Sequence, residues 1–187
     1  MRTSRVFRLI MRIFLMVCTI SMSVVSFLGA MSAILILSNP DNIDVNGENL
    51  EGEFDITKPD ELNLTLPFTI KNVGFFDIED LTIRIVLHME YSHINYSTPG
   101  VNETVTETIF DKTQSFDNIK SGDSLDDSFE GASKHFISEN IPDPLNELDR
   151  TQPVKFYVDI SLSMKYSLGL LTLAVNIIDY KMQELSF

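Results

Sequence analysis

Residues 81–91 read LTIRIVLHMEY, and this stretch decides the fold class of the chain. Apolar side chains occupy every second position and alternate with Thr82, Arg84, His88 and Glu90. Because successive side chains of a β-strand point to opposite faces, a period of two predicts a strand with one buried and one exposed face. A helix would place apolar residues three and four positions apart instead.

The same period recurs on both sides of this stretch. It is clear over Leu62–Ile70, and again in the closing pair Val154–Met164 and Leu171–Ile177. Weaker strands are expected near 53–56 and over 104–110, 113–119 and 124–136. No helical period separates these segments, so crossover helices are not expected. The pattern predicts a mainly β fold: an antiparallel, immunoglobulin-like β-sandwich of about seven strands.

Proline and glycine place the expected connections. Pro99 and Gly100 lie in a low-apolar stretch, Ser92–Glu103, which predicts a long loop. Pro142–Asp149 is compatible with a short helix. Pro67 interrupts the alternation of the second strand, and since proline has no N–H it predicts an edge or a bulge there.

The N-terminal segment carries a second signal. Ile13–Leu37 contains no charged residue and follows four arginines within the first twelve residues. At 1.5 Å per residue such a helix crosses a hydrocarbon core of ~30 Å. The basic flank and the acidic residues after position 40 predict a cytoplasmic N-terminus. A cleaved signal peptide with a site near Ala30 or Ser32 is the alternative, but the apolar run is longer than the h-region of a signal peptide.

Charge and cysteine content narrow the function classes. All 27 acidic residues lie after position 40, together with only ten lysines and arginines. Nucleic-acid binding needs clustered positive charge, so this partner class is excluded. The single cysteine, Cys18, lies in the apolar run, so no disulfide is expected. The predicted organisation is a basic cytoplasmic segment (1–12), a transmembrane helix (13–37), an acidic stalk (38–52) and an extracytoplasmic sandwich (53–187).

Three short stretches suggest a family. They are Leu66–Leu81, in which a strand is followed by Asn-Val-Gly, two aromatic residues and Asp-Ile, then Ile119–Ser124, and the closing Tyr166–Val175. Over about residues 53–179 the chain resembles the late-embryogenesis-abundant type 2 sandwiches (the water stress and hypersensitive response domains), and in particular their archaeal membrane-anchored forms. The resemblance implies a non-enzymatic domain associated with stress protection, membrane anchoring and protein contacts. Fibronectin-type and other adhesive sandwiches are the alternative for the fold.

The Asn72–Gly74 element has a physical interpretation of its own. Asparagine can hydrogen-bond its own backbone, and glycine can adopt a positive φ, so the chain can change direction between two strands. Phe75 and Phe76 are then expected to cap one end of the core. A structural role is predicted for this element in preference to ligand binding.

One segment matches the spacing of a calcium loop. Counting Asn42 as position one, oxygen ligands stand at Asn42, Asp44, Asn46 and Glu53, with Gly47 at position six. Position eight is polar instead of apolar, and the following residues do not resemble a helix. Calcium is the only cofactor that the sequence suggests, and a solvated acidic stalk is the alternative.

Other site motifs are few. Asn63, Asn95 and Asn102 begin N-glycosylation sequons. The three histidines show no zinc-binding spacing, and the chain has neither a phosphate-binding glycine loop nor a nucleophile elbow.

These observations predict a single-span membrane protein that displays an acidic sandwich outside the cell and binds without catalysis. Its expected partners are the membrane and an envelope protein or a second copy of itself, through the polar sheet face and the Ser92–Glu103 loop. A stress-protective or apolar-ligand-binding module, with a cavity between the sheets, is the first alternative. A hydrolase that uses Asp123, Asp126 and Asp127 is the second.

Overall fold

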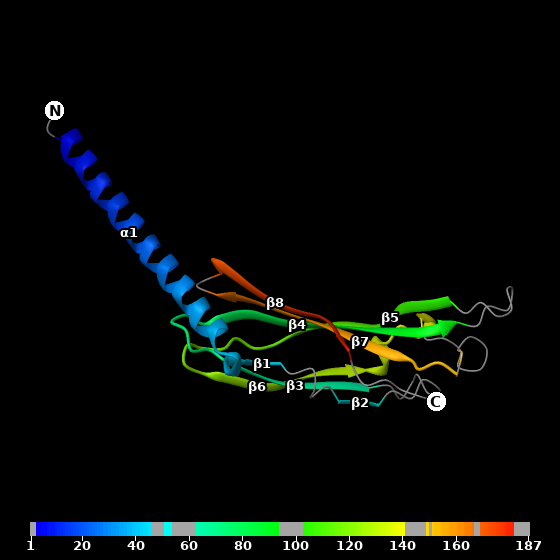
Figure 1. Ribbon diagram of the computed structural model, residues 1–187. Coiled ribbons are helices and arrows are strands. Elements are labelled where there is room, and N and C mark those ends of the chain that lie inside the picture. Colours follow the sequence, from blue (N-terminus) through cyan, green and yellow to red (C-terminus); the bar gives the residue numbers. More distant parts are fainter. Residues whose placement is uncertain are drawn as a thin grey trace.

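The chain forms one long helix followed by a β domain (Figure 1). The computed structural model describes residues 3–45, 51–53, 63–93, 103–140, 149, 151–166 and 169–181. Helix α1 (Thr3–Ser38) ends in a short 3₁₀ turn, η1 (Pro40–Asn42), which leads directly into the first strand. The helix contains neither proline nor an acidic residue, so nothing in it interrupts the helical hydrogen bonds.

The β domain has two antiparallel sheets. The first contains β1 (Ile43–Asp44), β2 (Glu51–Glu53), β3 (Asn63–Lys71) and β6 (Ser124–Ala132). The second has the order β5-β4-β7-β8, from β4 (Ile78–His93), β5 (Glu103–Ser115), β7 (Lys155–Tyr166) and β8 (Leu171–Lys181). Strand β6 pairs with β3 over its whole length, so β1 and β2 share the other side of β3, one after the other. The predicted antiparallel β-sandwich is confirmed. Since β1 and β2 occupy one place beside β3, the described strands fill seven places in the two sheets.

The core lies between the facing sheets. Buried and exposed residues alternate along β3, β4 and β7, as the period of two predicted. The largest fully buried side chains include Leu64 and Leu66 of β3, Leu87 of β4, Phe110 of β5 and Tyr166 of β7. Apolar residues of β8 are half-buried against this core, because β8 is an edge strand.

Strand β5 differs from the prediction of two short strands. It is continuous, and its pairing with β4 shifts between Leu87 and His88, so that Ile109 is an extra residue. Ile109 and Phe110 are consecutive and both buried, which a regular strand does not allow and a β-bulge does. The expected break at Asp111–Lys112 is absent, because both residues pair with β4, and the strand ends at Ser115, before the expected end at 119.

The predicted acidic stalk is also corrected. Residues 43–44 and 51–53 do not stand apart from the domain, because they pair with β3 as β1 and β2.

Three further bounds differ from the prediction. The strand expected over 124–136 ends at Ala132, and the chain goes on in two 3₁₀ turns, η4 (Ser133–His135) and η5 (Ser138–Asn140). The expected loop is shorter than 92–103, since Ser92 and His93 still pair with β5, and residues 94–102 lie outside the described part. The helix expected over Pro142–Asp149 falls almost wholly outside it too.

Pro67 lies in an interior strand, not at the edge of the sheet. It is opposite Ser128 of β6. On the other side of β3, β1 pairs as far as Thr69 and β2 as far as Thr65, so no described strand residue is opposite Pro67 there. On that side Pro67 therefore resembles a residue of an edge strand, where the lack of an N–H group on proline is tolerated.

Candidate functional site

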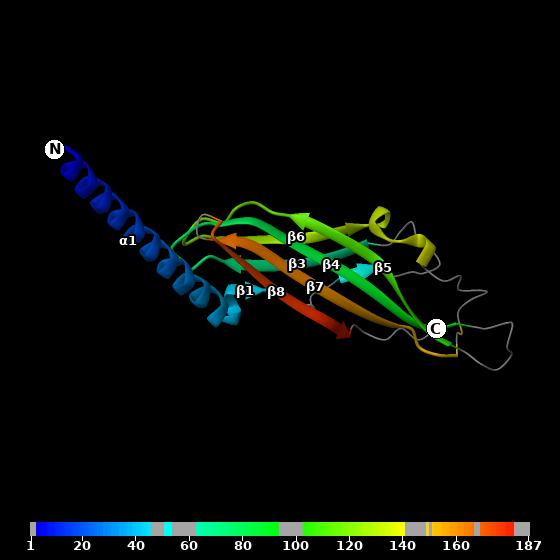
Figure 2. The same ribbon diagram turned by 90° about the horizontal axis from the view of Figure 1, so that it is seen from above.

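The end of α1 packs against one end of the sandwich. Figures 1 and 2 show it passing the end where the β3–β4 and β7–β8 connections lie. Gly29, Ser32 and Ile36 are buried, and Val25 and Leu28 are half-buried. These positions recur every three or four residues, so they form one stripe along the helix. Over Phe7–Ser38 the helix is long and apolar enough to cross a membrane, a property that anchors and signal sequences share.

Helix and sandwich approach closely at Gly74. A Cβ atom added to Gly74 would lie 1.9 Å from the Tyr166 hydroxyl oxygen and 2.9 Å from the Ser32 Cβ. The backbone N–H of Phe75 donates to Ser32 Oγ at 3.0 Å, and that of Phe76 donates to Tyr166 Oη at 2.9 Å. The β3–β4 loop is therefore held between the helix and β7, and only glycine fits at its centre. We call this arrangement the junction.

Asn72 organises the β3–β4 loop from inside. Its side chain is 1% exposed, and Nδ2 donates to the carbonyl oxygens of Phe76 (2.8 Å) and Ile119 (2.9 Å). Its Oδ1 accepts the N–H of Gly74 at 3.1 Å. The predicted structural role of Asn72 is thus observed, because a fully bonded amide replaces regular strand pairing here.

Two details of that prediction are wrong. Positive φ values among the described glycines occur at Gly122 and Gly169, not at Gly74, so Gly74 is required for close approach and not for backbone conformation. Phe76 does pack on the core, with its ring edge-on to Tyr166 at 6.0 Å between centroids. Phe75 does not, because it is 53% exposed.

Asn42 closes the C-terminal end of α1. It is 6% exposed, and Nδ2 donates to the carbonyl oxygens of Leu35 (3.1 Å) and Ile36 (3.4 Å). The last carbonyls of a helix have no partner within it, so a side-chain donor stabilises them. Ser32, Asn42 and Asn72 are the three buried polar side chains of the described residues. All three bind backbone groups where α1 meets the sandwich.

The described ends of the predicted calcium loop lie far apart. Asp44 is opposite Thr69 and Glu53 is opposite Asn63, six residues apart along β3. At ~3.3 Å per residue these positions are about 20 Å apart, whereas ligands of one Ca²⁺ lie within about 2.6 Å of it. Asn42 instead binds the helix end, and Asn46 lies outside the described residues. Among the described residues, no group of three histidine, cysteine or acidic side chains is arranged to hold a metal.

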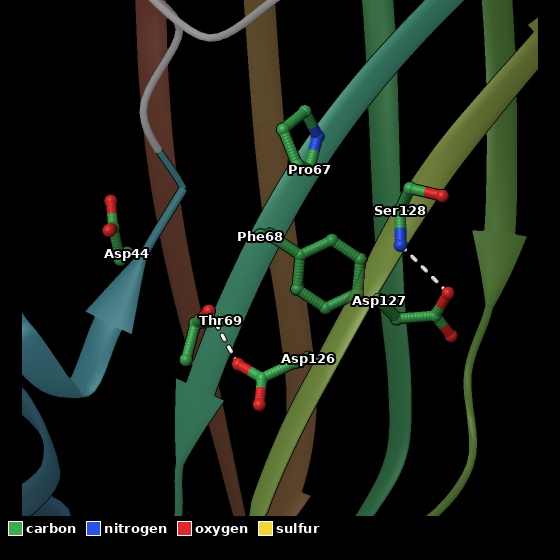
Figure 3. A pocket seen from close by; sticks show the side chains of 7 residues that line it. All are labelled: Asp44, Pro67, Phe68, Thr69, Asp126, Asp127 and Ser128. Carbon is green, nitrogen blue, oxygen red and sulfur yellow. Dashed lines mark hydrogen bonds between the residues drawn. The ribbon is translucent and has the colours of Figure 1, made fainter.

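An acidic depression lies on the outer surface of β1, β3 and β6 (Figure 3). Thr69 Oγ1 donates to Asp126 Oδ1 at 2.7 Å, and the Ser128 N–H donates to Asp127 Oδ1 at 2.7 Å. The two carboxylates lie on opposite sides of the β6 ribbon, and each has a hydrogen bond within the domain. The structure therefore does not direct Asp126 and Asp127 at one point, as the hydrolase alternative requires.

The outer face of the second sheet is covered by paired charges. Arg84 of β4 binds Asp111 of β5 through two hydrogen bonds, of 2.9 and 2.6 Å. This hydrogen bond and the opposite charge raise the pKa of Arg84, and the Arg84 hydrogen bond holds the pKa of Asp111 below its usual value.

Further pairs join β4 to β7. Lys155 Nζ donates to Glu90 at 2.6 Å, and His88 Nε2 lies 3.4 Å from Asp159. The outer face of β5, β4 and β7, which we call the paired-charge face, is polar with little unpaired charge.

A groove with three basic side chains, Lys112, Lys134 and His135, lies beside β5 and η4. Lys112 Nζ donates to Gln114 Oε1 (3.0 Å) and to the Glu130 carbonyl oxygen, and it lies 5.1 Å from the centre of the Phe129 ring. Burial lowers the pKa of Lys112. Burial and the positive charges of Lys112 and Lys134 also lower the pKa of His135, against the opposing hydrogen bond with the Ala132 backbone.

The glycosylation candidates are only partly described. Asn63 is exposed at the start of β3 and paired with Glu53 and Ala132. Asn95 and Asn102 lie outside the described residues.

Sequence reasoning missed Ser32 and Tyr166 as members of the junction. Ser32 had a signal, since it is a polar residue four before Ile36 in an apolar run. The position of Tyr166 had none, since its partners are about 90 residues away in the chain.

Comparisons with known proteins give no assignment. No family model and no curated protein matches the chain. Among solved structures, it is similar to the sporulation control protein Spo0M from Bacillus subtilis, with 17% identity and a TM-score of 0.32 over 73% of this chain and 48% of that one. It is also similar to a β-glucosidase from Listeria innocua in complex with glucose, with 15% identity and a TM-score of 0.28 over 75% of this chain and 16% of that one. The chain thus spans half or less of these proteins, and likenesses at this level carry no functional argument.

Proposed function

We propose that this protein is a single-span membrane protein that holds an acidic β-sandwich outside the cell and binds a protein partner there without catalysis. The observation that carries the proposal is the junction. The buried Ser32 of α1 accepts the N–H of Phe75 from the sandwich, and the buried Asn42, in the turn that leads into β1, caps the helix end, so the helix is part of the folded domain at one end.

This packing favours an anchor over a cleaved signal. Helix α1 runs unbroken through Ala30 and Ser32, where a cleavage signal was considered. Cleavage there would cut the helical turn that packs on Gly74 and would separate Gly29 from the rest of the buried stripe. The orientation rests on the four arginines that precede the apolar run.

The paired-charge face is the proposed contact surface. Its described ion pairs already compensate one another, so a partner that covers it does not have to neutralise a strong local field. The acidic depression on the opposite sheet has no such compensation from a basic side chain among its lining residues. An envelope protein or a second copy of the chain, with a polar surface of low net charge, fits the paired-charge face.

The test combines membrane extraction with site-specific crosslinking. Full-length protein in native membranes is expected to resist alkaline extraction, and its sandwich to be digested by protease added from outside. A photo-reactive phenylalanine derivative at Tyr157, half-buried on the paired-charge face, is expected to capture one dominant partner, identified by mass spectrometry. The same probe at Glu130, exposed on β6, is the matched control. Alkaline release of the intact chain contradicts the anchor, and equal capture from both positions contradicts the contact surface.

A further inference from the structure

The sandwich end that carries the junction exposes several large apolar side chains. Four large hydrophobic residues of the described β domain are exposed: Val73 (47%), Phe75 (53%), Leu170 (57%) and Ile178 (68%). Three of them lie at this end, Val73 and Phe75 in the β3–β4 loop and Leu170 in the β7–β8 turn. Figures 1 and 2 both place these two connections beside the helix. We call the three residues the apolar tip.

The helix remains apolar beside the tip. Met31, Ile34, Leu35 and Leu37 are 38–67% exposed although they flank the buried Ser32 and Ile36. Between Ser32 and Ser38 every helix residue is apolar. The last helical turns and the apolar tip therefore both expose large apolar side chains, which water solvates poorly.

Helix length places this surface relative to a bilayer. The uncharged run Ile13–Leu37 has 25 residues, which at 1.5 Å each is about 38 Å, longer than a hydrocarbon core of ~30 Å. A core counted from Ile13, the first residue after Arg12, takes about 20 residues and ends near Ser32. Ser32 is the residue whose Oγ accepts the N–H of Phe75. The apolar tip is thus at the level where the hydrocarbon ends.

The charges nearby fit the headgroup level. Asp77 accepts the N–H of Ser121 at 2.9 Å, and Lys165 pairs with Asp80 at 2.8 Å. Lys120, in the β5–β6 turn, is exposed at the same end. The acidic residues of the domain give no electrostatic attraction to anionic lipid, so apolar contact is the attraction that this surface offers.

We infer that Val73, Phe75 and Leu170 insert into the interface of the same bilayer that α1 crosses, so that the sandwich rests on the membrane. The occupant of this surface is lipid: the upper acyl chains and the headgroup boundary of the outer leaflet. This inference rests on the proposed anchor. It adds that the sandwich is seated by two contacts, the helix and the apolar tip, which fixes how the paired-charge face is presented.

The experiment measures the depth of single labelled cysteines in full-length protein reconstituted into phosphatidylcholine vesicles. The native Cys18 is first replaced by serine, and cysteine is then introduced one position at a time as Phe75→Cys, Ile178→Cys and Ile20→Cys. Each is labelled with an environment-sensitive fluorophore. Ile178 is the matched control, because it is also a large apolar residue with high exposure (68%). It lies on β8 seven positions beyond the start of the strand, away from the β7–β8 turn that carries Leu170. Ile20, 52% exposed on α1, reports whether the helix spans.

At position 75 we expect several-fold stronger quenching by lipid with a spin label high on the acyl chain than at position 178, and weak quenching by aqueous iodide. Equal iodide quenching at 75 and 178, with position 20 quenched by a deep spin label, overturns the inference and leaves the anchor standing. Iodide access at position 20 overturns the anchor itself. Shielding of position 75 from both quenchers means that protein covers the tip, which overturns lipid as the occupant. Val73→Cys repeats the test at a second position of the tip.

Discussion

Replacing Gly74 with alanine tests the junction directly. The new Cβ would lie 1.9 Å from Tyr166 Oη and 2.9 Å from the Ser32 Cβ, whereas real contacts are rarely below 3.0 Å. Tyr166 is fully buried and its ring packs on Phe76, so it cannot move aside freely. Moving it would also break the hydrogen bond from the Phe76 N–H.

The magnitude follows from these two effects. Overpacking costs about 1–3 kcal/mol and a buried donor left without its partner about 1–3 kcal/mol, while the loss of glycine flexibility in the unfolded chain returns about 0.4–1 kcal/mol. We expect Gly74→Ala to lower the free energy of unfolding by about 3 kcal/mol. For a domain of this size that corresponds to a fall in Tm of about 9 °C. Thermal unfolding of the full chain in detergent, followed by circular dichroism of the β domain, measures it.

A double-mutant cycle separates this mechanism from general destabilisation. Tyr166→Phe removes the atom of the shortest contact at the cost of its hydrogen bond. The Gly74→Ala and Tyr166→Phe pair should therefore be more stable than the sum of the single variants by at least about 1 kcal/mol. Gly122→Ala is the control, since it has open space but a φ of 86°, and backbone strain there costs about 1–2 kcal/mol with no coupling to Tyr166. Additive effects of Gly74→Ala and Tyr166→Phe would refute the proposed contact.

Three further predictions concern polar side chains of the sandwich and its helix. Asn72→Ala removes hydrogen bonds from the carbonyl groups of Phe76 and Ile119 and from the Gly74 N–H, of which the Ile119 carbonyl keeps the Ile78 N–H as a partner. It should cost about 2–4 kcal/mol in denaturant unfolding; an unchanged midpoint would contradict the role of Asn72. Asn42→Ala should lower stability by about 1 kcal/mol and speed amide hydrogen exchange in the last turn of α1, and unchanged exchange there would argue against capping by Asn42. The third concerns the His135 imidazole, whose pKa burial holds below 6.5 in the folded state. The unfolded state then binds more protons, so stability present above pH 6.5 is lost as pH falls through the folded pKa; His135→Gln should flatten this part of the stability–pH curve, and an unaltered curve would exclude His135 as its source.

Much of the fold could be predicted because alternation is a local property. In β3, β4 and β7 the polarity of each residue indicates whether its side chain faces the core or the solvent. The strands and the two-layer architecture can therefore be predicted from the order of residues alone. The prediction was wrong where the pattern is interrupted. The bulge at Ile109 places two buried residues in succession, and β1 and β2 are too short and too polar to show a period.

The candidate site was harder to predict, because its members are distant in sequence. Asn72 and Gly74 stand out in the sequence as a turn, but their partners Ser32, Ile119 and Tyr166 are brought together only by packing. The calcium loop shows the opposite case: its spacing fits a calcium site, but the pairing with β3 places its described ends, Asp44 and Glu53, opposite residues that are six positions apart.

The sequence by itself determined an apolar helix long enough to span a bilayer, the charge asymmetry around it, and a set of alternating strands that must form a sandwich. These depend on the composition and period of contiguous residues. Only the tertiary structure decided that the helix ends as part of the sandwich, that Gly74 is needed for space, and that Val73, Phe75 and Leu170 are exposed together at that end. These features depend on how the helix, the β3–β4 loop and β7 pack against one another, and the free energy of that packing comes from residues far apart along the chain.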